Sequence, residues 1–142
     1  GVAVMNTDDL KRQRFFMNFV QDLELNKQKK LYLNRRWKTP DVFRKMGQFV
    51  VSAQERDPLS YLHLECFHLG IPMIHDSHPF SSCGYYYNNG NIPMAANQIK
   101  NAVMNHSLNL NEYRNSARLL TQKYSPNNRA NIDRIDKLIK TL

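Results

Sequence analysis

Cysteine, glycine and proline are all scarce in this sequence of 142 residues, which contains 2, 5 and 6 of them. Two cysteines form one disulfide at most, which excludes a disulfide-stapled fold and makes a reducing compartment the default. The low glycine and proline content excludes collagen-like and low-complexity chains. With 42% hydrophobic and 23% charged residues, the composition is that of one globular domain with a sizeable core, spanning residues 1–142.

The sequence also lacks long apolar runs and a secretion signal. Its longest apolar runs, residues 2–5 and 49–51, fall far short of the ~20 residues that a membrane helix needs. No charged segment leading into an apolar one marks a signal peptide at the N-terminus. We therefore expect a soluble, cytoplasmic protein with no membrane span. Gly1 stands where a complete chain starts with Met, which indicates a fragment cut from a longer chain.

Acidic residues are the minority among the charged ones. There are 12 Asp and Glu against 20 Lys and Arg, which gives a net charge of +8 and a pI near 9.7. This balance favours polyanionic partners such as phosphates, nucleic acid or anionic lipid. The excess lies at both ends of the chain, +6 over residues 1–50 and +4 over residues 101–142, and no DNA- or RNA-binding motif is recognisable. Nucleic-acid binding is therefore an alternative, as is a noncatalytic α/β interaction domain, and neither is our first expectation.

Strand-like and helix-like segments alternate through the first two-thirds of the chain. Short β-branched or aromatic runs predict strands, and apolar residues at helical spacing predict helices between them. We expect residues 6–9 to hold the N-cap of the first helix and Thr39 to cap the second, with Pro40 at its first helical position. The predicted strands are residues 1–5, 29–34, 48–52, 72–76 and 84–87, the first and third of them buried, and the predicted helices are residues 10–23, 39–46 and 57–69.

The clearest element is the helix over residues 57–69. Asp57 and Pro58 form a cap-then-proline start, Gly70 supplies a left-handed stop, and Pro72 prevents continuation. The alternation of strands and helices predicts an α/β fold that is Rossmann-like, with a mainly parallel sheet of 4–5 strands flanked by helices. A helical C-terminal tail completes it, with helices expected over residues 92–106, 110–124 and 127–142.

Ligands of open parallel sheets bind beyond the carboxyl ends of the strands, where loops lead into helix N-termini. At the predicted helix start, the first free amides belong to Leu59, Ser60 and Tyr61. Such amides, together with the helix dipole, favour a phosphate. The alternative is that Asp57 and water cap them.

Three charged side chains complete the expected nucleotide site. Arg35 and Arg36 follow the second predicted strand, and their guanidinium groups suit a diphosphate; the alternative is that both are solvated. Glu65 lies two turns into an otherwise apolar helical stretch, where a carboxylate costs free energy unless it is paired. It either accepts two ribose hydroxyls, as the acidic residue of dinucleotide-binding folds does, or lies on the exposed stripe of an amphipathic helix.

Cysteine and histidine are concentrated in the middle of the chain, a composition that can indicate zinc. The candidate ligands contain no CxxC or HxxxH pair, and we therefore expect no metal. We interpret the first cysteine as a small core residue and the histidines as loop or site-rim groups. These candidates are Cys66, His68, His75, His78 and Cys83.

Residues 57–76 contain an acidic residue, seven further residues, Glu65, a helix end, Gly-Ile-Pro and an apolar strand. This stretch resembles the acidic-x7-Glu signature of the C-terminal, donor-binding domain of GT-B glycosyltransferases. Residues 84–87 and 124–126 extend the resemblance and look like a family of GT-B-like proteins of bacteria and large viruses. The resemblance covers most of the chain, is most specific over residues 48–87 and is weak near the N-terminus.

The resemblance implies a Rossmann-like domain that binds a nucleoside diphosphate-sugar as donor substrate, with no other cofactor. Glu65 would bind the ribose, Asp57 would lie nearer the sugar, and basic residues would contact the diphosphate. Two positions depart from the familiar pattern. Asp57 stands where that pattern has Glu. Residues 56–59 (Arg-Asp-Pro-Leu) replace a glycine-rich segment, which changes how closely the backbone approaches the phosphate.

A GT-B enzyme needs two such domains, and 142 residues hold only one. The resemblance therefore implies that a glycan or other acceptor binds to a missing N-terminal domain. The chain alone is then expected to bind the donor without transferring the sugar. Viral members of the family extend the expected location to an infected host cell or a virion.

Overall fold

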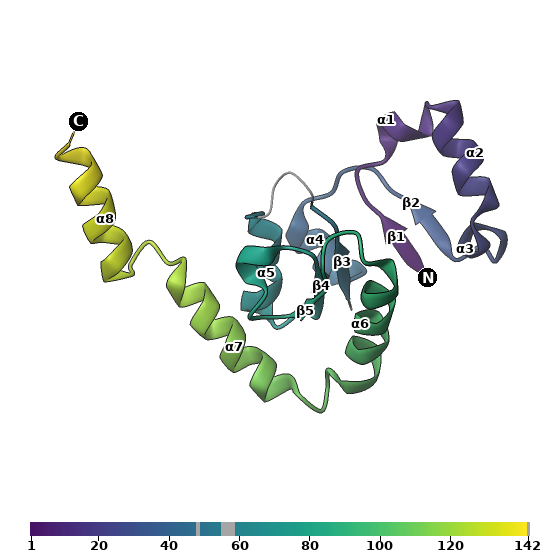
Figure 1. The fold of residues 1–142 in the computed structure, drawn as a ribbon. Coiled ribbons are helices and arrows are strands. Elements are labelled where there is room, and N and C mark those ends of the chain that lie inside the picture. The colour runs from purple at the N-terminus through teal and green to yellow at the C-terminus, as the bar shows by residue number, and fades with distance from the viewer. Residues whose placement is uncertain (48, 55–58, 142) are drawn as a thin grey trace. The chain divides into compact units, whose positions relative to one another are not determined.

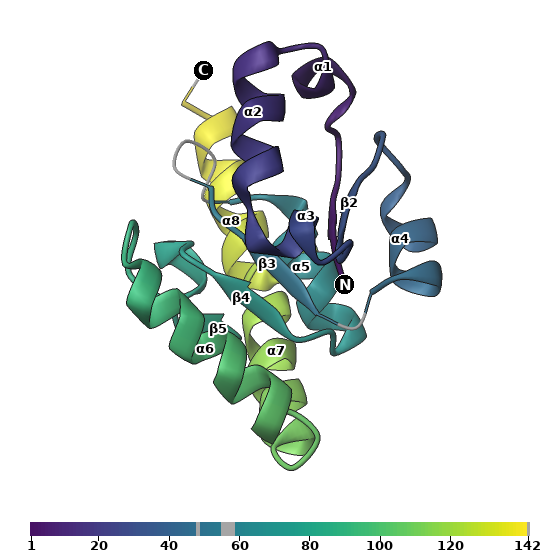
Figure 2. The same ribbon diagram turned by 90° about the vertical axis from the view of Figure 1, so that its right-hand side faces the viewer.

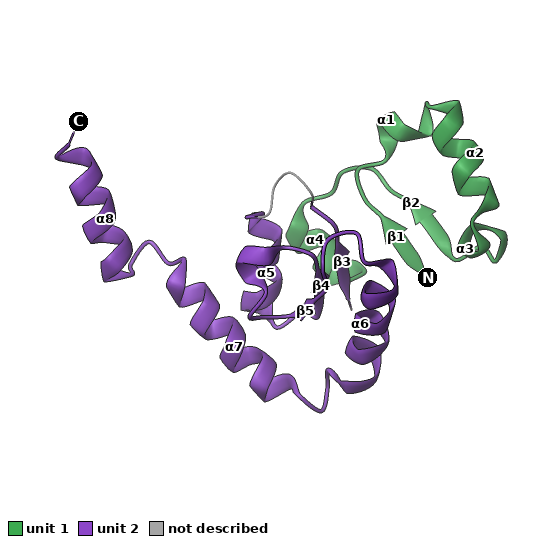
Figure 3. Cartoon of the chain, in the orientation of Figure 1, with its two compact units in different colours: residues 1–47 green, residues 48–142 purple. Residues whose placement is uncertain are grey.

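Parallel strands connected by helices make up both compact units of the chain (Figures 1 and 2). The computed structural model describes residues 1–47, 49–54 and 59–141, and its units are Gly1–Gly47 and Gln48–Leu142 (Figure 3). The α/β class and the parallel pairing are as predicted. The strands form two sheets, of two and three strands, rather than one sheet of four to five, because local sequence patterns specify strands but not the strands that pair.

In the first unit, β1 (Val2–Val4) and β2 (Leu31–Leu33) form a parallel pair. They are connected by α1 (Asp8–Lys11), α2 (Arg14–Asp22) and α3 (Glu24–Lys27), and α4 (Thr39–Lys45) follows β2.

The loops that leave β1 and β2 are joined through Thr7, which is fully buried. Its hydroxyl and its amide both donate to the carbonyl oxygen of Asn34, at 3.0 and 2.9 Å. Two backbone bonds therefore link the carboxyl ends of the two strands, since the Asn34 amide also donates to the carbonyl of Val4 at 2.8 Å.

Three predictions for the first unit need correction. Residues 2–4 are exposed rather than buried; successive strand residues point to opposite faces of a sheet, so neither face of β1 is fully covered. The helix predicted over residues 10–23 is divided by an extended residue at Gln13; Leu10 and Phe15 are five positions apart, which departs from helical spacing. Thr39 is the first residue of α4 and not its N-cap, a shift of one residue.

The second unit contains β3 (Val50–Ser52), β4 (Met73–His75) and β5 (Tyr85–Tyr86) in the sheet order β3-β4-β5. Val50 pairs with Met73, and Ile74 pairs with Tyr85. The central strand β4 is entirely buried. At the edge, Val51 of β3 is 57% exposed, and Phe49 just before the strand is 40% exposed. The prediction of a buried strand over residues 48–52 is therefore wrong at both positions; Gln48 lies outside the described residues.

Helices cover this sheet. α5 (Tyr61–Leu69) connects β3 to β4, and the 3₁₀ turn η1 (His78–Phe80) precedes β5. α6 (Ile92–Asn105) packs against β4 and β5, and α5 packs against α7 (Leu110–Lys123) (Figure 2). Three helices complete the chain, as predicted: α6 (Ile92–Asn105), α7 (Leu110–Lys123) and α8 (Arg129–Ile139). None of the residues of α8 is buried.

The core of the second unit lies between α5, β4 and η1. Phe67, Met73, Ile74 and Phe80 are at most 1% exposed. Tyr113 of α7 closes the amino-terminal edge of the sheet, because its hydroxyl donates to the carbonyl before β4 and accepts from the first amide of β4. These bonds run to the Ile71 carbonyl at 2.7 Å and the Met73 amide at 3.3 Å.

The helices of the structure test two further predictions, one about the end of α5 and one about membrane spans. Gly70 has a φ of +70° and ends α5, so the predicted left-handed stop is confirmed. The longest helices, α6 and α7, have 14 residues each, and no helix in the described part of the chain combines the length and the apolar character needed to cross a bilayer.

Candidate functional site

Polar residues follow all three strands of the second sheet at its carboxyl edge. Ser52 ends β3, Asp76 comes directly after β4, and Tyr87 comes directly after β5. Parallel strands bring their carboxyl ends to the same edge, and α/β folds bind ligands there. We therefore take this carboxyl edge as the candidate site.

Two hydrogen bonds hold the loops at the carboxyl edge. The backbone amide of Gln54 donates to Asp76 Oδ1 at 2.9 Å, and the Tyr87 hydroxyl donates to the carbonyl oxygen of Ser52 at 3.1 Å. Burial raises the pKa of Tyr87, and the negative charge of Asp76 raises it further. The phenol is therefore neutral, and a donor, at physiological pH.

One buried acceptor at this edge has no partner among the described residues. Gln54 Oε1 is inaccessible to solvent and receives no hydrogen bond within the described ranges. Buried polar atoms are nearly always hydrogen bonded in folded proteins. A donor from a bound molecule or from water would satisfy this oxygen.

Two histidines lie beneath the carboxyl edge rather than on its rim. His63 of α5 and His75 of β4 are both fully buried, with ring centroids 5.4 Å apart. His75 Nε2 lies 2.8 Å from the carbonyl oxygen of Cys83, which it reaches as a donor. Burial lowers the pKa of His75, so its ring is neutral at physiological pH. The interpretation of His75 as a loop or rim group is wrong, because its strand is the central one.

The start of α5 differs from the prediction. Its first helical residue is Tyr61 and its N-cap is Ser60. Leu59 lies in an exposed turn, so its amide and that of Ser60 precede the helix, and the free helical amides begin at Tyr61. Serine is itself a favoured N-cap residue, and Ser60 takes the place predicted for Asp57, which lies outside the described residues.

Glu65 lies on the exposed face of α5, one turn after the first helical residue, whereas a start at Asp57 predicts two turns. Tyr61 precedes it by four residues and is 81% exposed, so the two side chains share a face. The opposite face is buried and carries His63, Cys66 and Phe67. The Glu65 carboxylate therefore lies on the exposed stripe of the helix, which is one of its two predicted environments. Its contact with a ribose stays a prediction.

Arg35 and Arg36 are exposed and follow β2, as predicted, with Asn34 between the strand and Arg35. They belong to the unit of residues 1–47, and the candidate carboxyl edge belongs to the other unit. Their contact with a diphosphate stays a prediction.

Sequence analysis did not identify Gln54, Asp76 and His63 as parts of the candidate site. A signal was present for the first two, because each is a polar residue within two positions of the carboxyl end of a predicted strand. For His63 the signal was its place on the same helical face as Cys66 and Phe67.

Both cysteines are free and buried. Burial raises the pKa of Cys66 to about 12 and the pKa of Cys83 to about 11, so both thiols are protonated at physiological pH. Cys66 is a core residue, as predicted, with no exposed surface. Within the described residues, no group of three or more His, Cys, Asp or Glu side chains is arranged to hold a metal ion.

Comparison with known proteins relates the chain to one family. No curated protein and no solved structure matches it. A family model described as a protein of unknown function (DUF2827) matches residues 1–139. Since this match spans nearly the whole chain, the protein belongs to the DUF2827 family.

Proposed function

We propose that this chain is the donor-binding domain of a GT-B-type glycosyltransferase and binds a nucleoside diphosphate-sugar at the carboxyl edge of the β3-β4-β5 sheet. One observation carries the proposal. The helix that follows the carboxyl end of β3 contains Glu65, the second acidic residue of the acidic-x7-Glu signature, and it exposes Tyr61 and Glu65 on one face. Rossmann-like domains bind nucleotides at such an edge.

Each part of the donor has a group suited to it. The diphosphate is attracted by the free amides at the start of α5 and by the helix dipole. Glu65 accepts hydrogen bonds from the ribose hydroxyls, and the resemblance assigns the sugar to Asp57, which is outside the described residues. Gln54 Oε1, the buried acceptor without a partner among the described residues, receives a donor from the ligand.

Transfer of the sugar needs an acceptor held against the donor and away from water. Such positioning lowers a reaction barrier by ~7–11 kcal/mol. In the proposed architecture a facing domain holds the acceptor, a glycan or another hydroxyl compound. Residues 1–142 alone therefore bind the donor without turning it over.

The test measures the binding of UDP, GDP, ADP and CDP and of their sugar conjugates. Thermal shift and NMR detect the binding, and a separate assay measures turnover. We expect one base to bind best. Glu65→Gln should weaken that binding by about tenfold or more, the loss of one or two hydrogen bonds to a charged group. Asp136→Asn removes an exposed carboxylate from α8 and should leave it unchanged. Absence of binding, or equal binding by Glu65→Gln, contradicts the proposal.

The net charge of +8 favours nucleic-acid binding as the second candidate. The two functions differ in salt dependence, because binding to a polyanion releases many counterions. A titration with single-stranded RNA at two salt concentrations separates them. Tight, steeply salt-dependent binding of RNA, without binding of any nucleotide-sugar, would favour the second candidate.

A further inference from the structure

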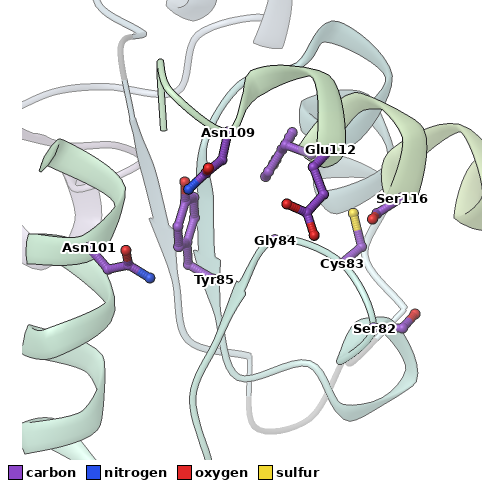
Figure 4. Close-up of a pocket in the computed structure, with 9 residues that line it drawn as sticks. Ser82, Cys83, Gly84, Tyr85, Asn101, Asn109, Glu112 and Ser116 are labelled. Carbon is purple, nitrogen blue, oxygen red and sulfur yellow. The ribbon is translucent and has the colours of Figure 1, made fainter. Parts of the chain in front are cut away.

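A cavity lies at the other end of the same strands. Where β5 begins, a cavity of about 170 Å³ opens between the start of that strand, α6 and the first turns of α7 (Figure 4). All of its lining residues belong to the second unit. We call it the α6–α7 cavity.

Hydrogen-bonding side chains surround the α6–α7 cavity. Asn101 comes from α6, and Asn109, Glu112 and Ser116 come from the start of α7. Figure 4 shows the Glu112 carboxylate directed toward the segment at Gly84, and the two asparagine amides on the side of Tyr85.

Two of these side chains are not engaged elsewhere in the described part of the chain. Asn109 is the N-cap of α7, but its side chain makes no capping hydrogen bond within the described ranges. Glu112 forms no salt bridge with any described residue. An amide and a carboxylate are thus available at the same opening.

The aromatic wall of the cavity is fixed before any ligand binds. The rings of Tyr85 and Tyr113 are stacked, with centroids 6.0 Å apart and planes 25° apart. The hydroxyl of Tyr85 lies 3.1 Å from His106 Nδ1, and that of Tyr113 is bonded to the backbone before β4. Side chains that are locked in this way present a preorganised surface.

The volume of the cavity limits the size of its ligand. The cavity of about 170 Å³ has room for several water molecules. Pockets for drug-sized ligands occupy about 300–1,000 Å³, so a nucleoside diphosphate is too large. One six-membered ring with its substituents is the size that fits.

We propose that the α6–α7 cavity binds a single neutral sugar ring. A sugar hydroxyl both donates and accepts, which matches the Asn109 carboxamide and the Ser116 hydroxyl, which do both, and a Glu112 carboxylate that accepts. Asn101 offers its amide as a donor, since its oxygen already accepts from Asn105 at 2.8 Å. An ammonium ligand would leave the amide donors of Asn101 and Asn109 without partners, and the net charge of +8 repels cations. The proposal rests on this cavity alone and does not depend on the proposed donor site.

The experiment is an NMR titration of the ¹⁵N-labelled chain with glucose, galactose, mannose and N-acetylglucosamine. At least one sugar should shift the backbone signals of Tyr85 and Glu112 and the side-chain amide of Asn101. Glu112→Ala should weaken that binding by at least about tenfold, and Glu112→Gln, which keeps an acceptor oxygen, should weaken it less. Arg118→Ala, an exposed change on the same helix outside the cavity, should leave it unchanged.

Two results would overturn the proposal. One is the absence of shifts at these residues with all four sugars. The other is binding of ethanolamine at Glu112 without binding of any sugar. Glu112 is exposed, and the spectrum of each variant reports directly whether it folds; Asn101→Ala on α6 provides a second variant that should also lose affinity. Failure of every nucleotide to bind would contradict the proposed donor site but not this proposal, since the cavity lies at the amino-terminal edge of the sheet.

Discussion

Tyr87 and Ser52 are joined across the central strand of the β3-β4-β5 sheet. The hydroxyl of Tyr87 donates to the carbonyl oxygen of Ser52 at 3.1 Å, over a sequence separation of 35 residues. Both residues are buried. The bond therefore connects the ends of the two outer strands at the edge where the donor site is proposed.

Removing this hydroxyl should destabilise the second unit. In Tyr87→Phe the ring remains, but the buried carbonyl of Ser52 loses its donor, which lowers the free energy of unfolding by about 1–3 kcal/mol. Urea denaturation followed by circular dichroism measures the change. Tyr32→Phe is the control, because Tyr32 is 57% exposed, and it should have no effect. Equal stability of Tyr87→Phe and the original protein would show that the bond contributes nothing.

Gly84 and Gly90 form a matched pair for a test of packing, because both have a φ of +74°. A methyl group at Gly84 would lie 2.9 Å from the Met73 carbonyl oxygen and 2.9 Å from a ring carbon of Phe67, whereas nothing lies within 4 Å at Gly90. Gly90→Ala should lose about 1–2 kcal/mol from left-handed backbone strain. Gly84→Ala should lose about 1–3 kcal/mol more from overpacking. Urea midpoints of the two variants give the comparison, and equal midpoints would refute it.

Acid should destabilise the protein through His75. Burial holds the pKa of His75 below its ordinary value of 6.5, whereas an unfolded histidine titrates near 6.5. The unfolded chain therefore binds the proton first, and the free energy of unfolding falls as the pH drops below 6.5 toward the folded-state pKa. Burial lowers the pKa of His106 as well, so it acts in the same direction.

Urea unfolding between about pH 8 and about pH 5 tests this linkage. His75→Gln should show a shallower pH dependence than the original protein, whatever its stability at neutral pH. His68→Gln changes an exposed ring on α5 and should keep the original dependence. If the free energy of unfolding of His75→Gln depends on pH as steeply as that of the original protein, groups other than His75 cause the loss of stability in acid.

The two thiols should react slowly, and in a fixed order. Only the thiolate is nucleophilic, and burial raises both thiol pKa values, to about 12 for Cys66 and about 11 for Cys83. We expect little labelling by an alkylating reagent at neutral pH, with Cys83 modified before Cys66, and fast labelling of both in urea. Mass spectrometry of the digested protein identifies the modified residue. Early modification of Cys66 would show that its site opens more readily than the folded structure implies.

The carboxyl-terminal end of α5 and the positions of the strands were predictable because their signals are local. The end of α5 follows from Gly70, whose left-handed backbone needs no distant contact. The break between α1 and α2 also has a local signal, the five-residue interval between Leu10 and Phe15. The prediction of one continuous helix over residues 10–23 did not take this interval into account.

Strand pairing and burial were less predictable because they depend on distant segments. The exposure of Val51 follows from the edge position of β3, and the burial of His75 follows from the central position of β4. The residues of a strand do not by themselves specify whether it lies at the edge or in the centre of a sheet. For the candidate site, the chain pattern located the carboxyl edge and α5, but two residues suited to an N-cap, Asp57 and Ser60, compete for the start of that helix.

The order β3-β4-β5 also bears on how the chain folds during synthesis. Val50 pairs with Met73, and Ile74 pairs with Tyr85, so neighbouring strands are consecutive in the chain and their loops close at small entropic cost. The Met73 amide, however, bonds to the hydroxyl of Tyr113, 40 residues later. A nascent chain emerging from the ribosome can therefore pair its strands before α7 has been made. The amino-terminal edge of the sheet is completed last, once Tyr113 has left the exit tunnel.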